Sequence, residues 1–169
     1  VSTSPIIGRA LTGVGAISIS FWRMLIASII LWIFSSIKPQ GRMKVASNYN
    51  RTICAGILLG IHFALFFEAI KITTISNATF LGTLAPFFTL ILEIYILKRT
   101  FSKVVLFGLI ITFLGSLIIL VYDFDLSSSF TLGNIYAVLC SICLAIAFII
   151  AEKVRENENT IVYTRTLYL

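Results

Sequence analysis

Four ionisable side chains stand inside long apolar stretches of this sequence. Arg23, His62, Glu68 and Arg165 all have mostly hydrophobic neighbours. An ionised group at the centre of a membrane helix costs about 2.5–3.5 kcal/mol, so each needs a reason to be there. An arginine can draw an anionic or zwitterionic solute into a cavity, or it can extend its guanidinium to the membrane surface. Both roles stay open for Arg23, and all four residues are predicted to line a solute pathway.

The acids and the histidine also have simpler local roles. Glu68 lies three residues before Lys71, so the two share a helix face; an ion pair is favoured over a proton-coupling carboxylate. His62 can titrate near neutral pH, but it lies about 120° around the helix from Glu68. A packing role with one hydrogen bond is therefore predicted for His62. Glu93 lies near a helix end and is predicted either to extend its carboxylate to the membrane surface or to pair with a basic loop residue.

A proline marks a second group of pathway candidates. Pro86 falls inside an apolar run, where its missing N–H and its ring should kink or open the helix. Open backbone at membrane depth is tolerated where it lines a cavity. We therefore add Gly82, Thr83, Pro86 and Thr89 to the predicted substrate pathway.

Other residues favour packing over chemistry. Cys54, Cys140 and Cys143 all lie in apolar runs, and an odd number of such thiols argues against a disulfide framework. No histidine cluster accompanies them, so we predict no metal site and no cofactor. One histidine with scattered acids gives no nucleophile–base pair, so the protein is not expected to be an enzyme. Two small-xxx-small pairs, Gly56 with Gly60 and Ser141 with Ala145, predict close helix contacts.

The elements that carry these residues are predicted to be membrane helices. Of the 169 residues, 59% are hydrophobic and 12% charged, with a mean hydropathy of +1.03, whereas a soluble domain is about a quarter charged. Apolar runs near bilayer length occupy residues 17–37, 52–70, 77–97, 104–122 and 132–151. Shorter runs at 1–11 and 160–169 are expected to be pieces of helices from a longer protein. The predicted fold is an all-α, polytopic transmembrane bundle.

Basic residues predict the orientation of the chain. The loops at 38–51, 98–103 and 152–159 hold nine of the 13 Lys and Arg residues. The alternate loops carry only Lys71 and the acids Asp123 and Asp125. The positive-inside rule therefore predicts cytoplasmic basic loops in a multi-pass protein, with the cell's plasma membrane as the expected location. The same rule explains the net charge of +6 without a nucleic-acid partner.

The chain also repeats itself weakly. Residues 21–25 (FWRML) recur in style as residues 163–167 (YTRTL), and residues 4–11 resemble residues 147–154 one residue off the same register. The repeat unit would hold five helices, so the second copy would be inverted in the membrane, as in many secondary transporters. We predict a first repeat at 1–122, an extracytoplasmic loop at 123–131 and the start of a second repeat at 132–169.

Four segments resemble a known family over nearly the whole chain. They are residues 20–27 (SFWRMLIA), 60–73, 77–89 (NATFLGTLAPFFT) and 108–115, and the third is the most specific. They resemble the second to fifth helices of the EamA domain of the drug/metabolite transporter superfamily. The resemblance implies ten helices in two five-helix repeats that move small organic metabolites or drugs by alternating access. Where that family often has a glutamate after the fourth helix, this chain has Lys98 and Arg99.

A second class of function stays open. The chain could be a non-transporting membrane scaffold that regulates a partner, and a homodimer is a further expectation. The expected partners of a transporter are a small-molecule metabolite and the lipid bilayer. Flux of a solute separates the two classes, because a scaffold moves none.

Overall fold

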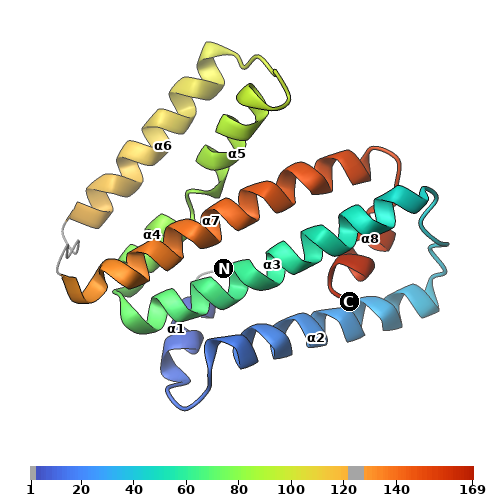
Figure 1. Ribbon diagram of the computed structural model, residues 1–169, viewed down its shortest axis with the longest axis horizontal. Coiled ribbons are helices and arrows are strands. Elements are labelled where there is room, and N and C mark those ends of the chain that lie inside the picture. Colours follow the sequence, from blue (N-terminus) through green and yellow to red (C-terminus); the bar gives the residue numbers. More distant parts are fainter. Residues whose placement is uncertain (1–2, 122–127) are drawn as a thin grey trace.

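The computed structural model describes residues 3–121 and 128–169, and all secondary structure in these ranges is helical (Figure 1). This confirms the predicted all-α bundle. The helices in chain order are α1 (Thr3–Ala10), α2 (Ala16–Ile37), α3 (Ala46–Ile72), α4 (Ile75–Gly82), α5 (Ala85–Tyr95), α6 (Lys103–Val121), α7 (Ser128–Arg155) and α8 (Thr160–Leu167).

Four helical stretches of the described residues are long and apolar enough to cross a membrane. They are Ala16–Ile37, Ala46–Ile72, Ile75–Tyr95, which combines α4 and α5, and Thr131–Arg155. Helix α6, Lys103–Val121, matches the span predicted at 104–122, and its described residues Lys103–Gly115 form an apolar stretch. A helix must satisfy its own backbone hydrogen bonds in lipid, so the chain is a multi-pass helical membrane protein.

Two helices extend beyond the apolar runs that predicted them. Helix α3 begins at Ala46 rather than at 52, and α7 covers Ser128–Arg155 rather than 132–151. Hydropathy detects the hydrocarbon-spanning part only, and a helix can continue into the polar interface. Residues 128–131 of the predicted extracytoplasmic loop are therefore helical, and Asp123 and Asp125 lie outside the described residues.

The core lies where α3 and α7 run side by side (Figure 1). Its residues are small, and Ala55, Ala69, Ala137 and Ala145 are fully buried. A Cβ atom on Gly133 would lie only 2.7 Å from the Cβ of Thr73. Small side chains let helix backbones approach closely in lipid, where close packing replaces the hydrophobic effect as a driving force. Helix α2 lies on the opposite side of α3 from α7.

The predicted small-xxx-small contacts are present. Gly56 lies against the backbone carbonyl of Leu167, so a side chain at this position would collide with α8. Ser141 donates a hydrogen bond to the Leu81 carbonyl, and Ala145, one turn further along α7, is fully buried. These positions join α3 to α8 and α7 to α4.

The helix that contains Pro86 is interrupted, as predicted, but the break comes earlier. Helix α4 ends at Gly82 and α5 begins at Ala85, with Thr83 and Leu84 between them. Pro86 lies in the first turn of α5, where a missing N–H leaves no hydrogen bond unmade. The proline therefore starts the second half of the span instead of bending a continuous helix.

The three basic loops meet at one end of the bundle. The Glu158 carboxylate, just before α8, accepts hydrogen bonds from the backbone N–H groups of Lys44 (2.9 Å) and Val45 (2.9 Å) at the start of α3. Arg99, between α5 and α6, lies 2.7 Å from Glu152 near the end of α7. Residues 38–51, 98–103 and 152–159 are thus on the same side of the protein.

Candidate functional site

A cavity of about 650 Å³ lies beside the break between α4 and α5. Helices α1, α2, α3 and α7 supply its other walls, and most of its lining atoms are apolar. Five of the eight predicted pathway residues line it, namely Arg23, His62, Gly82, Thr83 and Pro86. The structure thus brings together residues from three predicted spans.

Arg23 lies two turns into α2 and reaches this cavity. Its Nη1 donates a hydrogen bond to Ser4 Oγ at 2.8 Å, and its guanidinium carbon lies 4.2 Å from the centre of the Phe63 ring. A cation over an aromatic face is attracted by the ring's negative quadrupole. The ion pairs found among the described residues join Arg99 to Glu93 and Glu152 and do not include Arg23. The guanidinium is therefore a cation at an apolar cavity.

His62 is held by packing and one hydrogen bond, as predicted. The side chain is buried, and its Nδ1 lies 2.8 Å from the Cys140 carbonyl on α7. Nδ1–H must be the donor in this bond, because a carbonyl oxygen only accepts. The ring centre lies 5.1 Å from that of Phe63 and 6.4 Å from that of Phe66. His62 therefore ties α3 to α7 at the cavity wall.

The α4 wall contains a residue that the sequence did not single out. Thr79 lines the cavity, and its buried Oγ1 has no hydrogen-bond partner among the described residues. Thr79, Gly82, Thr83 and Pro86 have the i, i+3, i+4, i+7 spacing of one helix face, a signal that could have identified Thr79. Gly82 allows the Phe66 ring to lie close, since a Cβ there would be 3.1 Å from it.

The remaining predicted residues lie outside this cavity. Arg165 donates hydrogen bonds to Ser35 Oγ and to the Gly41 carbonyl, and its guanidinium carbon lies 4.9 Å from the Trp32 ring centre. Glu68 is half-buried on α3. Its predicted ion pair with Lys71 is wrong. Lys71 instead donates to the Val14 carbonyl in the turn before α2, and the i, i+3 spacing could not anticipate this competing acceptor.

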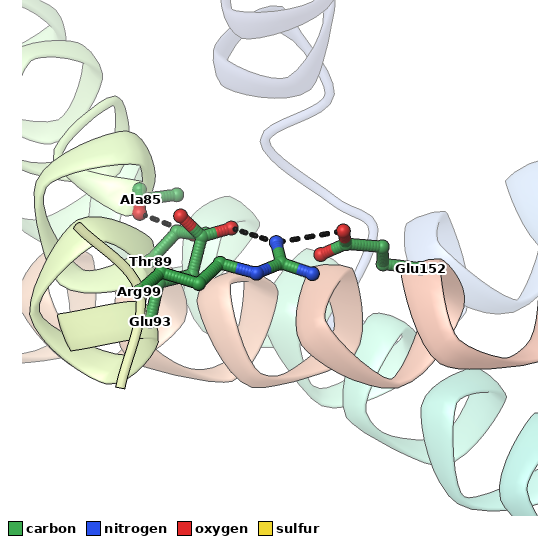
Figure 2. Close-up of polar contacts among 5 residues, drawn as sticks. All are labelled: Ala85, Thr89, Glu93, Arg99 and Glu152. Carbon is green, nitrogen blue, oxygen red and sulfur yellow. Dashed lines mark hydrogen bonds and ion pairs between the residues drawn. The ribbon is translucent and has the colours of Figure 1, made fainter. Parts of the chain in front are cut away.

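Thr89 and Glu93 belong to a second region, shown in Figure 2. The Thr89 hydroxyl donates to the Ala85 carbonyl at 2.8 Å within α5. Arg99 Nη1 lies 3.4 Å from Glu93 Oε1 and 2.7 Å from Glu152 Oε1, so one guanidinium bridges two carboxylates. The hydrogen bond with Glu152 raises the pKa of Arg99. Of the two roles predicted for Glu93, the structure shows the pairing with a basic loop residue.

Membrane helices around an apolar cavity, with one span interrupted at its wall, define a polytopic membrane protein of the transporter class. The sequence model of the EamA-like transporter family matches residues 1–121, and the chain belongs to this family. The chain is also 25% identical, over 119 residues, to the uncharacterized transporter sll1164 of Synechocystis sp. (strain ATCC 27184 / PCC 6803 / Kazusa). That similarity covers 67% of this chain and 34% of the relative, so the chain spans about a third of the relative's length. The resemblance of the four segments is thereby confirmed.

Proposed function

We propose that this chain forms the first repeat, and the beginning of the second, of a secondary transporter that moves small organic metabolites or drugs by alternating access. The observation that carries this proposal is the 650 Å³ cavity at the α4–α5 break. Transporters place solute sites near the midplane beside interrupted helices, where unpaired backbone can face a cavity.

The repeat organisation supports the proposal. Residues 1–122 form the first repeat, and α7 and α8 open the second. Arg23 and Arg165, at equivalent positions in the weak sequence repeat, have the same local chemistry: each guanidinium lies over an aromatic ring and donates to a serine hydroxyl. The three basic loops share one end of the bundle. We place this end in the cytoplasm and the protein in the plasma membrane.

Thiol labelling of the cavity tests alternating access. The protein is expressed from its complete reading frame, with Thr83→Cys in the cavity and Ile110→Cys on the exposed face of α6 as the control. We expect Cys at 83 to react with a membrane-impermeant reagent from either side of the membrane, and a transported solute to change its rate. The control should not respond to solute.

A solute screen in proteoliposomes supplies the second readout. Saturable flux of at least one small organic solute is expected. Absence of flux for every solute, together with solute-independent labelling at position 83, would overturn the proposal and leave the membrane scaffold as the better description.

A further inference from the structure

The charged side chain that lines the cavity is positive. Arg23 is the one Lys or Arg among the described lining residues, and no Asp or Glu lines the cavity with it. The nearest titratable neighbour in the wall is His62, whose Nδ1 proton is engaged by the Cys140 carbonyl. A positive charge without a counter-ion beside an apolar cavity attracts an opposite charge that comes close. The cavity is therefore built to attract an anion.

The Arg23 guanidinium has further hydrogen-bond donors that can bind this anion. It carries five N–H donors, of which one is engaged with Ser4 Oγ. The contact of its carbon with the Phe63 ring, at 4.2 Å from the ring centre, restrains the position of the guanidinium. A planar fork of two N–H groups matches the two oxygens of a carboxylate or sulfonate, which a lysine ammonium cannot do. Thr79 lines the same cavity, and its enclosed hydroxyl has no hydrogen-bond partner among the described residues, so a change of its side-chain rotamer would let it donate to the solute.

The rest of the cavity suits an apolar body. Phe66, Ile75, Leu144 and Phe148 line it, and polar atoms form a small part of the surface. Its volume falls in the usual range of about 300–1,000 Å³ for small-molecule sites. A sugar or nucleotide would leave many of its polar groups without partners in such a site, at a cost for each group. A dianion would need a second cation.

We infer that the solute is a monovalent organic anion: Arg23 holds its acidic group, Thr79 donates a further hydrogen bond to it, and its apolar body lies against Phe66 and Phe148. This substrate class rests on the proposed transport function. Both kinds of acid, carboxylate and sulfonate, share the chemistry that the guanidinium recognises.

The experiment compares three solutes with one carbon skeleton in proteoliposomes that contain the protein from its complete reading frame. The solutes are a 3-phenylpropyl sulfonate, the matching uncharged sulfonamide and the matching primary ammonium. The sulfonate keeps its charge at all working pH values, so it does not leak through lipid as a neutral acid. We expect saturable flux of the sulfonate, competed by 3-phenylpropionate, and at least tenfold lower flux of the other two.

Variants then assign the anion preference to Arg23. Arg23→Gln should lower sulfonate affinity at least tenfold, and Arg23→Lys should lower it about threefold to tenfold because the charge remains but the fork is lost. Thr79→Val should lower affinity by a smaller factor. Arg42→Gln, which removes an exposed charge from a basic loop, should match the parent protein.

The outcomes test the transport function and the anion substrate class separately. Flux of the ammonium or the sulfonamide in preference to the sulfonate would overturn the anion assignment while leaving the transporter intact. No flux of any of these three solutes would overturn the anion assignment, whereas the transport function falls only if the solute screen and the labelling at position 83 also fail. If Arg23→Gln does not fold, the solute preference of the parent protein still tests the substrate class.

Discussion

Replacement of Glu158 should loosen the start of α3. Its carboxylate accepts hydrogen bonds from the backbone N–H groups of Lys44 and Val45 and from Asn48 Nδ2 at 3.1 Å. Only 7% of Glu158 and 2% of Asn48 are exposed. Loss of a helix cap costs about 0.5–2 kcal/mol, and a hydrogen bond to a charged group contributes about 1.5–3 kcal/mol. Since water can replace part of the cap at a loop, we expect Glu158→Ala to cost about 2–3 kcal/mol.

Hydrogen exchange measures this loss locally. A cost of about 2–3 kcal/mol corresponds to roughly 30- to 150-fold faster exchange of the amides at 44–48, since about 1.4 kcal/mol is a factor of ten. Glu158→Gln keeps one acceptor oxygen and should lose about half as much. Glu156→Ala is the matched control, because it removes an exposed carboxylate from the same loop. Equal exchange in the Glu158→Ala and Glu156→Ala variants would refute the capping role.

The same carboxylate predicts a pH dependence. Burial opposes its ionisation, but the hydrogen bonds from Lys44, Val45 and Asn48 prevail and lower the pKa of Glu158 below its ordinary 4.5. A lowered pKa in the folded state means that the stabilisation is complete above the unfolded value and is lost as the pH falls through the folded one. The exchange difference between the parent protein and Glu158→Gln should therefore stay constant from about pH 8 to 5.5 and shrink below about pH 4.5. A difference that shrinks between pH 8 and 6 would contradict the assignment.

Two further changes test other contacts. Gly56→Ala should lower the unfolding free energy in detergent by about 1–3 kcal/mol, because its Cβ would collide with the Leu167 carbonyl. Gly108→Ala is the control, since nothing lies within 4 Å of its Cβ. This change should leave the unfolding free energy unchanged or raise it by up to about 1 kcal/mol. Equal effects would show that α8 does not pack on Gly56. Raising salt to about 1 M should speed hydrogen exchange at residues 96–102 in the parent protein, because the exposed Arg99–Glu152 pair is screened. Arg99→Gln should exchange fast at both salt concentrations, and a salt effect that survives in this variant would exclude the ion pair as its cause.

The sequence predicted the fold well because lipid restricts the choices of the chain. An apolar run of about twenty residues in a bilayer must be a helix, so the spans were located before their packing was known. The ends of α3 and α7 were missed, since polar helical turns outside the hydrocarbon have no hydropathy signal. Pro86 predicted that its span is interrupted. It did not predict that the break lies at Thr83 and Leu84.

The cavity was only partly predictable. Arg23 attracted notice because a charge in an apolar run is costly, and Pro86 because it disturbs a helix. Ser4, Phe63 and Thr79 carry no signal in the sequence that separates them from their neighbours. They line one cavity only because α1, α3 and α4 pack around it. The Glu68–Lys71 prediction failed for the related reason that it considered one helix alone.

The proposed repeat makes a statement about where Arg23 and Arg165 should lie. Arg23 lies near the start of α2, whereas the partners of Arg165 on that helix are Trp32 and Ser35, near its end. Twelve residues of helix separate Arg23 from Ser35, a rise of about 18 Å. Each arginine lies within about two turns of the start of its own helix, so α2 and α8 begin at opposite ends of the bundle. If the two arginines are equivalent, a direct repeat would put both at the same end, whereas the inverted repeat that we propose requires opposite ends.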